Sequence, residues 1–455
     1  MTISRRQFVA GCSTAIAAMA GGRLGQMVFA ADPQAEGIYH NYLPTMQSPE
    51  QIFIMVFLRG GCDALSLLSP YDDPVYTQKR VNPQSSWDSL VLKSPIKIDP
   101  NNPDFNPTSS FGLHPSAAPL HELYKAGKMA FVHATGLNDD TRSHFDAMDY
   151  IERGTPGNKL TNSGWLARHI AAIGESSALL PTVSAGSAVP ASLLSFNDTV
   201  AMNDLNSYGL NAPWAYHNKD NQSMLATLNT LYGSEGAFGE AGRRALEVVN
   251  TIQSLKNGGT KLDYTPDAGI TYPNGGLSGS LKTLAQIIKL NLGLRIATVD
   301  FGGWDTHDNQ GTNGGYFSGQ VDTLSRALHA FYNDLPSHRD RLNIVVMSEF
   351  GRRLGMNGGG GTDHGHGGMM MVLGGKVNGG KIYGRWPGLL DLDQNQDLRI
   401  TTDYRAVLGE MLAYRMGNTK LNTVFPGLKA ASAGELGYQR LGIVSNSDIA
   451  VSLDT

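Results

Sequence analysis

The sequence is poor in cysteine, and this excludes one class of fold. Only two cysteines occur among 455 residues, and Cys12 lies in an N-terminal segment that we predict is removed. Cys62 then has no partner within the chain, which excludes a disulfide framework. The fold must therefore rest on an apolar core, and a chain of this length can bury a large one.

An excess of positive charge is also lacking. The formal net charge is −4. Loss of residues 1–30 would remove Arg5, Arg6 and Arg23 but no acidic residue, which lowers the charge to −7. Nucleic-acid-binding domains carry a basic surface. The charge balance therefore predicts that nucleic acid is not a partner.

The N-terminus lacks an apolar run long enough for a stable membrane span. It has instead a twin-arginine motif, Ser4-Arg5-Arg6-Gln7-Phe8-Val9, an apolar segment from Phe8 to Ala20, and Val28-Phe29-Ala30 before a cleavage point. These features predict a signal peptide over residues 1–30. We expect the twin-arginine translocase to export the chain in folded form to the periplasm or outside the cell.

Apolar runs alternate with helical patterns over most of the remaining chain. Strands are expected at 51–58, 129–133, 294–299, 343–347 and 369–373, and helices at 116–128, 280–292, 317–335 and 402–416. This alternation predicts an α/β fold, a doubly wound, mostly parallel sheet with helices on both faces. Residues 178–280 lack it, so we interpret them as a cap or insertion within a single domain at 31–455.

Chemically active side chains follow four of the predicted strands, and the strand at 129–133 leads to the turn Thr141–His144. Asp63 follows the strand at 51–58, Asp305 and His307 follow the strand at 294–299, and Glu349 follows the strand at 343–347. The carboxyl ends of parallel strands meet at one edge of a sheet, where ligands bind. We therefore expect these side chains to converge.

A glycine-rich loop adds further potential ligands. It carries Asp363, His364 and His366. Carboxylates and imidazoles together bind divalent metals, and we leave zinc, manganese, calcium and magnesium open. The predicted metal ligands are Asp63, Asp305, His307, Glu349, Asp363, His364 and His366.

The segment before the helical pattern at 144–151 has the character of an anion site. Thr141 or Ser143 would lie at the N-terminus of that helix, where backbone N–H groups attract negative charge. Arg352 or Arg353 could bind an anionic substrate, or could instead be solvated or paired with Glu349. Ser143 could simply cap the helix, His144 could be a packing residue, and Asp63 could be a turn residue.

Several motifs together resemble the DUF1501 family. They are Arg59-Gly60-Gly61-x-Asp63, Phe111-Gly112-Leu113-His114-Pro115, Ser143-His144-Phe145, Gly302-Gly303-Trp304-Asp305-Thr306-His307, Ser348-Glu349-Phe350-Gly351-Arg352, Gly361-Thr362-Asp363-His364-Gly365, Thr402-Asp403-Tyr404-Arg405-Ala406-Val407 and Val424-Phe425-Pro426-Gly427. That family is similar to a branch of the alkaline phosphatase and sulfatase superfamily.

The resemblance implies a metal site at the carboxyl edge of the sheet. It implies a nucleophile at Ser143 or Thr141, with Asp63, Asp305, His307, Glu349 and either His364 or His366 as ligands. This chain departs from the superfamily at Phe350, where a histidine is usual.

We therefore expect an exported metal-dependent hydrolase of phosphate or sulfate esters, acting on a small or polymer-borne anionic ester. Arg142 or Arg352 would hold the anion, and His144 or a loop histidine would be the general acid. One alternative is a non-catalytic envelope protein for binding or assembly, supported by Phe350. Another is a metal-dependent isomerase or transferase acting on a phosphosugar.

Overall fold

The computed structural model describes most of the chain after the N-terminal segment. The described residues are 50–174, 176, 178–209, 218–233, 235–256, 262–432, 435–444 and 448–454. The predicted signal peptide lies outside them. Among the described residues, no helix combines the length and apolar character that a membrane crossing requires. Cys62 is buried and forms no disulfide.

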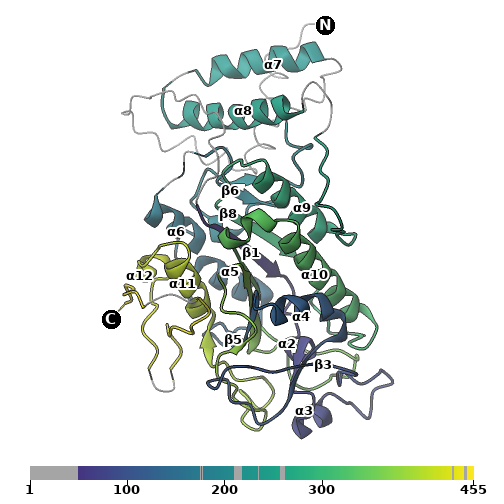
Figure 1. Cartoon of the computed structure of the whole chain (residues 1–455). Helices are drawn as coiled ribbons and strands as arrows, with labels where there is room; N and C mark the ends of the chain where they lie inside the picture. The colour runs from purple at the N-terminus through teal and green to yellow at the C-terminus, as the bar shows by residue number, and fades with distance from the viewer. Residues whose placement is uncertain are drawn as a thin grey trace.

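A nine-stranded sheet forms the centre of the molecule (Figure 1). Its order is β11-β5-β10-β9-β1-β8-β6-β7, and β12 also pairs with β5. The strands are β1 (Ile52–Leu58), β5 (Met129–Gly136), β6 (Thr182–Ser184), β7 (Val200–Ala201), β8 (Ile296–Phe301), β9 (Leu342–Ser348), β10 (Gly368–Gly374), β11 (Ile382–Tyr383) and β12 (Thr402–Asp403). Only β10 pairs antiparallel with its neighbours, so the predicted mostly parallel sheet is confirmed.

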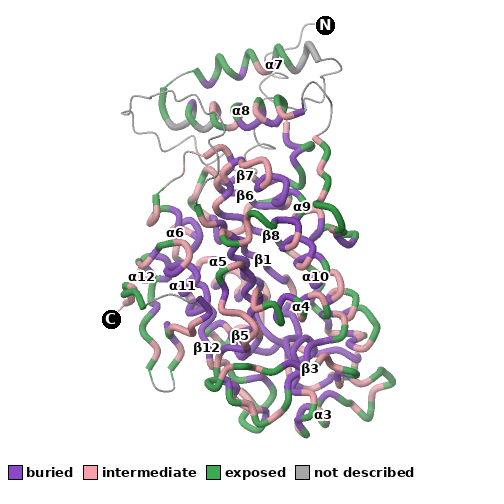
Figure 2. Tube along the Cα trace, in the orientation of Figure 1, coloured by how far each residue is buried: buried purple, intermediate pink, exposed green. Residues whose placement is uncertain are grey.

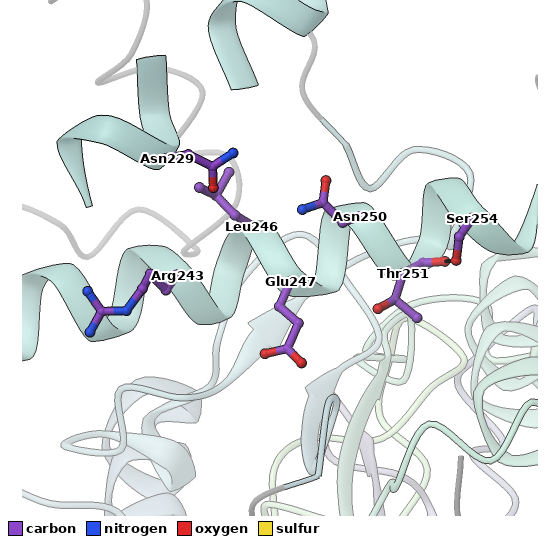
Figure 3. Close-up of a pocket in the computed structure, with 7 residues that line it drawn as sticks. All are labelled: Asn229, Arg243, Leu246, Glu247, Asn250, Thr251 and Ser254. Carbon is purple, nitrogen blue, oxygen red and sulfur yellow. Dashed lines mark hydrogen bonds between the residues drawn. The ribbon is translucent and has the colours of Figure 1, made fainter. Parts of the chain in front are cut away.

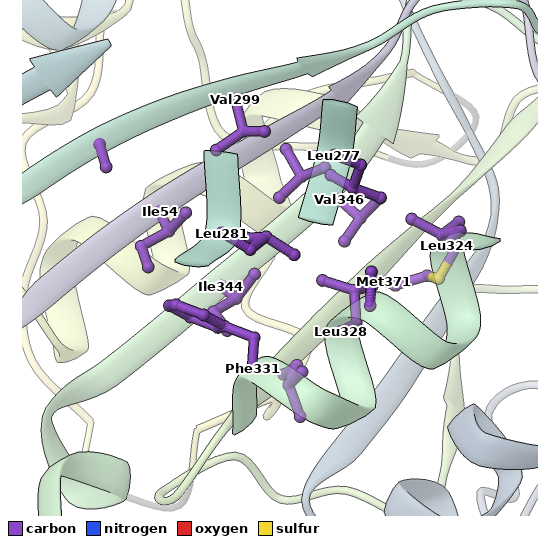
Figure 4. Packing of buried hydrophobic residues seen from close by; sticks show 14 of the residues in the cluster. Ile54, Leu277, Leu281, Val299, Leu324, Leu328, Phe331, Ile344, Val346 and Met371 are labelled. Carbon is purple, nitrogen blue, oxygen red and sulfur yellow. The ribbon is translucent and has the colours of Figure 1, made fainter. Parts of the chain in front are cut away.

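Strand β1 is buried on both faces because it lies between β8 and β9. Successive side chains of a strand point to opposite faces. Ile52, Ile54 and Val56 accordingly join one apolar cluster, while Phe53 and Met55 join a second. Figure 4 shows Ile54 in the first cluster with side chains from neighbouring strands and helices. This double burial explains why the sequence of β1 is a continuous apolar run.

Helices cover both faces of the sheet. The first cluster includes side chains of α4 (Ala118–Lys125), α9 (Gly276–Lys289) and α10 (Tyr316–Asn333). The second includes side chains of α5 (His144–Arg153), α6 (Trp165–Ile173), α11 (Tyr404–Tyr414) and α12 (Leu421–Val424). Each large apolar side chain that is fully buried stabilises the fold by roughly 1.5–3 kcal/mol. The two clusters therefore hold the sheet from both sides.

Several short elements complete the fold. A second sheet has the order β2-β4-β3, formed by Leu68–Ser69, Phe111–Leu113 and Ile96–Ile98. The short helices are α2 (Ala64–Leu67) and α3 (Pro74–Lys79), and the 3₁₀ segments are η2 (Pro115–Ala117), η3 (Ala191–Leu193) and η4 (Pro336–Arg341). The sequence analysis did not predict this second sheet, because its strands are only two or three residues long.

The expected insertion at 178–280 is only partly separate from the sheet. Helices α7 (Asn218–Leu231) and α8 (Ala237–Leu255) form a hairpin beyond the β6–β7 end of the sheet (Figure 1). Much of α7 is solvent-exposed (Figure 2). By contrast, β6 and β7 belong to the central sheet, and α9 begins at Gly276. Loops rich in polar residues concealed these two short strands in the sequence.

Candidate metal centre

Four segments that are distant in the sequence meet beside the sheet. His144 opens α5, Asp305 and His307 follow β8, Glu349 follows β9, and His364 lies in the loop before β10. Ser143 fixes the start of α5, because its hydroxyl accepts a hydrogen bond from the Asp146 N–H at 3.4 Å. The side chain of His144 is thereby fixed at the first helical position.

Gly60 allows two of these segments to approach each other. Its φ is +121°, and a Cβ at this position would lie 2.4 Å from the backbone nitrogen of Asp305. Only glycine tolerates both conditions. The Gly60 N–H also donates to Glu349 Oε1 at 2.8 Å. The loop after β1 thus holds both Asp305 and Glu349 in position.

The ring of His144 is oriented by a buried carboxylate. Its Nδ1 lies 2.7 Å from Glu349 Oε1. Because an ionised carboxylate only accepts hydrogen bonds, Nδ1 carries the proton and Nε2 of the neutral ring has a free lone pair. Nε2 lies 3.4 Å from Asp305 Oδ2 and has no hydrogen-bond partner among the described residues.

The rings of His364 and His307 are also oriented by an oxygen acceptor at Nδ1. His364 Nδ1 lies 2.7 Å from the Arg142 carbonyl oxygen, and His307 Nδ1 lies 3.2 Å from Asp363 Oδ1. Both acceptors require a proton on Nδ1. In the neutral rings, each Nε2 therefore presents a lone pair. The two Nε2 atoms lie only 2.8 Å apart.

These nitrogen lone pairs converge on Asp305. Its Oδ1 lies 3.2 Å from the Nε2 atoms of both His307 and His364. One ligand atom each from His144, Asp305 and His364 all lie within 4.8 Å of one another. Facing lone pairs repel unless a cation or a shared proton lies between them. His307 Nε2 lies beside this group of three, 2.8 Å from His364 Nε2. Imidazoles held through Nδ1, with Nε2 directed at a carboxylate, resemble the ligand arrangement of a transition-metal site.

The protonation states also suit a cation. Burial disfavours ionisation of Asp305, but Arg352 and the neighbouring histidines outweigh it and lower its pKa to about 2. Burial lowers the pKa of His364, which keeps this ring neutral near pH 7. The hydrogen bond that His144 donates to Glu349 raises the pKa of His144, so a proton competes for this ring more strongly than for His364.

Asn357 supports the centre although the sequence analysis did not select it. Its Nδ2 donates to Asp363 Oδ1 at 3.0 Å and to the His307 carbonyl at 2.9 Å. Its Oδ1 accepts the N–H groups of Gly359 and Gly361. Asp363 is thus a residue that orients His307, and Asn357 fixes them both. An asparagine in a glycine-rich loop gives no signal of this role in the sequence.

Arg352 is not available to an anionic substrate. Its side chain is fully buried and donates to the backbone carbonyls of Gly61 at 2.7 Å and Thr362 at 2.8 Å, and to Asp305 Oδ1 at 2.5 Å. It therefore positions the loops and Asp305. All of these hydrogen bonds are made inside the protein, because the glycine-rich loops contain backbone carbonyls that need hydrogen-bond donors.

Arg142 faces away from the cluster. Its guanidinium donates to Asp397 Oδ2 at 2.5 Å and to Gln394 Oε1 at 2.8 Å. Only its backbone carbonyl contacts the centre, through His364. The guanidinium of Arg353 can accept a further anionic partner. Its side chain is 33% exposed, and its contacts to Asp363 and Asp397 are 3.7 and 3.9 Å long.

Asp63 does not join the metal ligands. It is fully buried, caps α2 through Ser66, and receives Arg80 Nη2 at 2.9 Å and Gln310 Nε2 at 2.8 Å. Burial raises its pKa, but the Arg80 guanidinium outweighs this and lowers the pKa below its usual value. A guanidinium thus already neutralises the carboxylate for which the resemblance implies a metal.

The remaining predicted residues have separate partners. Thr141 Oγ1 accepts the Ser143 N–H at 3.2 Å, so both hydroxyls make local contacts at the start of α5. His366 is buried, and its Nδ1 pairs with Asp393 at 2.6 Å. It lines a polar cavity of about 700 Å³ that does not include the three converging histidines. Glu349 acts behind His144 and does not face Asp305 directly.

Phe350 occupies the position at which the superfamily usually has histidine. Its ring centroid lies 4.9 Å from that of His144 and 4.8 Å from that of His364. It thus packs beneath two of the three imidazoles. An apolar ring here limits their motion and adds no ligand.

A second hollow lies far from these residues. It follows α8 and has a volume of about 420 Å³ (Figure 3). It is lined by Asn229, Arg243, Leu246, Glu247, Asn250, Thr251 and Ser254. With a single carboxylate and no histidine, this lining does not provide a comparable set of metal ligands.

Comparison with known families identifies part of the chain. Residues 280–408 match the family DUF1501, described as a protein of unknown function. This match supports the resemblance of the chain to the DUF1501 family. The matched segment contains Asp305, His307, Glu349 and His364, whereas His144 lies outside it. No curated protein matches the chain significantly.

Solved structures are similar only at a distance. Ps i-CgsB in complex with k-i-k-neocarrahexaose shares 8% identity, with a TM-score of 0.35, over 83% of this chain and 74% of that chain. The PH0037 protein from Pyrococcus horikoshii shares 10% identity, with a TM-score of 0.21, over 72% of this chain and 88% of that chain.

Proposed function

We propose that this protein is an exported, metal-dependent hydrolase of phosphate or sulfate esters. The observation that supports the proposal is the convergence of three Nε2 atoms on Asp305, with every Nδ1 held by an oxygen acceptor. The ester class comes from the resemblance to the alkaline phosphatase and sulfatase superfamily. The twin-arginine motif supports export of the folded protein to the periplasm or outside the cell.

The ligand chemistry narrows the choice of metal. Magnesium, calcium and manganese prefer oxygen ligands, whereas imidazole suits zinc, copper, nickel and iron. His144, His307 and His364 would supply nitrogen, and Asp305 would supply oxygen. This set favours zinc over the manganese, calcium and magnesium that the sequence left open.

Separate side chains around the centre would bind the metal and attract the substrate. A divalent cation would polarise an ester oxygen and acidify a water molecule. The side chain of Asp305 is 47% exposed and that of His307 is 38% exposed, so an ester in solution can reach this face. Arg353, one third exposed and only loosely paired, is placed to attract the anionic group.

Water is the nucleophile that best fits the contacts. The hydroxyl oxygens of Ser143 and Thr141 both accept backbone N–H groups, and His144 directs its Nδ1 proton to Glu349. Among the described residues, no basic side chain is hydrogen-bonded to Ser143. We expect Ser143→Ala to retain turnover within about tenfold, whereas a serine nucleophile would require a loss of roughly 10⁴-fold or more.

A second candidate function is binding without catalysis. Three histidines and one aspartate are sufficient to fill a tetrahedral zinc shell, which is characteristic of a structural site. In that case the metal would stabilise an envelope protein for binding or assembly. Phe350, which provides no ligand, is consistent with this candidate.

One experiment distinguishes these functions. The full chain is expressed with its leader in a bacterium that has the twin-arginine pathway, and the purified protein is analysed for metal. Turnover of 4-nitrophenyl phosphate and 4-nitrophenyl sulfate is then measured across zinc, manganese, magnesium and calcium. Stoichiometric metal with turnover supports the hydrolase, and metal without turnover supports the binding protein. Protein that takes up no metal contradicts both proposals.

A further inference from the structure

Three exposed aromatic side chains surround the candidate metal centre. Phe145 is 83% exposed, Tyr316 is 55% exposed and Trp87 is 46% exposed. Full burial of an aromatic side chain stabilises a fold by roughly 1.5–3 kcal/mol. These three side chains are partly exposed and therefore contribute less than this to stability. Their exposed faces are therefore available to a ligand.

Each ring is attached to a segment that supplies or orients a metal ligand. Phe145 directly follows His144, so their Cα atoms are about 3.8 Å apart. Tyr316 lies against Gly303, where a Cβ would be 2.4 Å from its hydroxyl oxygen, and Gly303 precedes Asp305 by two residues. Phe145 and Tyr316 thus come from opposite faces of the sheet, on α5 and α10.

Trp87 flanks the third segment. A Cβ at Gly360 would lie 2.3 Å from its Cγ, and the φ of Gly360 is +77°. The loop could not carry a side chain at this position without displacing the indole. Gly360 lies three residues before Asp363, which orients His307. Each ring therefore lies on, or against, a segment of the candidate metal centre.

Polar groups lie next to two of the rings. Asp146, next to Phe145, pairs with Lys159. Gln320, beside Tyr316 at Gly303, donates to the Gly302 carbonyl at 2.9 Å. Protein-binding sites usually have a contiguous apolar centre. Single rings set among charged and amide groups instead match a ligand that alternates C–H faces with hydroxyl groups, which is the chemistry of a pyranose chain.

We propose that Phe145, Tyr316 and Trp87 form an aromatic rim that binds sugar rings, so that the ester substrate is carried on an oligosaccharide. The substrate assignment rests on the proposed hydrolase function. The aromatic faces would stack on pyranose C–H groups while the ester reaches Asp305 and Arg353. The rim selects substrates longer than a single sugar.

Calorimetry on the metal-loaded, full-length protein tests the rim. The probes are cellohexaose, chitohexaose and sulfated cellohexaose, each compared with glucose, N-acetylglucosamine or glucose 6-sulfate respectively. We expect at least one hexasaccharide to bind tenfold or more tightly than its monosaccharide. Phe145→Ala and Tyr316→Ala should each weaken that binding about two- to tenfold, as expected for loss of one ring contact.

Leu231→Ala is the matched control, because Leu231 is 47% exposed on α7, far from α5 (Figure 1). It should bind the hexasaccharide as the unmodified protein does, and all variants should retain metal. Equal binding of hexasaccharides and monosaccharides, or rim variants that bind like Leu231→Ala, would overturn the proposal. So would light scattering that shows Phe145→Ala converting a dimer into a monomer, because the rim would then be a protein contact.

The two proposals can fail separately. Hydrolysis of 4-nitrophenyl esters without any preference for hexasaccharides refutes the rim and leaves the hydrolase intact. Binding of a hexasaccharide by protein that cleaves no ester refutes the hydrolase and retains the rim as a sugar-binding site.

Discussion

At the scale of single residues, the orientation of each imidazole defines the candidate centre. Glu349, Asp363 and the Arg142 carbonyl each hold one Nδ1 proton. This constraint leaves three Nε2 lone pairs on one side. Groups behind metal ligands commonly contribute ten- to hundredfold in metal affinity. Substitution of the residues behind the ligands should therefore change metal affinity measurably, as substitution of the ligands does.

Replacement of His364 should abolish tight metal binding. Its Nε2 lies 2.8 Å from His307 Nε2 and 3.2 Å from Asp305 Oδ1, so His364→Ala removes the central ligand. We expect metal affinity to fall by more than about 100-fold, since loss of a ligand should exceed the effect of groups behind it. Competition with a chelator, followed by elemental analysis, measures the change.

His329→Ala is the matched control for this variant. His329 is partly exposed on α10 and pairs with Glu122. It should retain the metal affinity of the unmodified protein. If His364→Ala also retained it, the convergence of the three rings would not be a metal site.

Replacement of Glu349 should weaken binding without removing a ligand. Glu349→Gln keeps the shape of the side chain but loses the charge that holds the Nδ1 proton of His144. We expect metal affinity to fall about ten- to hundredfold. Chelator competition measures this fall, and the effect should be smaller than that of His364→Ala. An equal or larger effect would make Glu349 a direct ligand.

At the scale of elements, buried charge joins α2 and α3 beside the centre. Arg80, at the C-terminal cap of α3, pairs with Asp63, the N-cap of α2, and both side chains are fully buried. Removal of one partner of such a pair leaves an uncompensated charge in the interior. This pair therefore stabilises the loops that carry the ligands.

Arg80→Ala should destabilise the protein by about 3–5 kcal/mol. Asp63→Asn combined with Arg80→Met should cost less than Arg80→Ala alone, because the double variant leaves no unpaired charge. Urea unfolding measures both values. Arg326→Ala, which removes an exposed pair with Asp322, should change stability by less than about 1 kcal/mol. Additive effects at Asp63 and Arg80 would contradict a direct pair.

At the scale of the whole molecule, the sheet buries two neutral histidines. Burial lowers the pKa of His133 to about 4, and burial, aided by Arg295, lowers the pKa of His169 to about 3. His133 Nδ1 accepts the Ala134 N–H at 2.9 Å, while Nε2 lies 3.0 Å from the Leu68 carbonyl. A second proton would break the first contact and bury a charge.

Stability should therefore fall in mild acid. The unfolded pKa of histidine is about 6.5, so the stability contributed by each neutral ring is complete above that pH. It is lost as the pH falls below 6.5 towards the lowered pKa in the folded protein. We expect each ring to contribute a loss of about 2 kcal/mol between pH 7 and pH 5.

Urea unfolding at pH 7 and pH 5 tests this expectation. His133→Gln should reduce the pH-dependent loss by about 2 kcal/mol, whatever its effect at pH 7. His329→Gln should leave the difference between the two pH values unchanged. An unchanged difference in His133→Gln would show that His133 does not remain neutral in the folded protein.

The sequence alone predicted the frame of the molecule and several residues of the centre. Continuous apolar runs revealed β1, β8 and β9, because central parallel strands are buried on both faces. Residues directly after such strands, including Asp305, could be placed at one edge of the sheet. Strands of two or three residues, such as β7 and β12, carry too little periodic signal for prediction.

Only the tertiary structure decided which charged residues join the centre. Asp63 and Asp305 both follow strands, yet Asp63 is buried against Arg80, whereas Asp305 contacts Arg352 and also faces the histidines. Arg352 likewise donates its hydrogen bonds to backbone carbonyls and not to a substrate. Local sequence pattern reports which residues are near a strand end. The partner of a charged group depends instead on how the chain folds: Arg80 lies 17 residues from Asp63, whereas His144 lies 205 residues from Glu349.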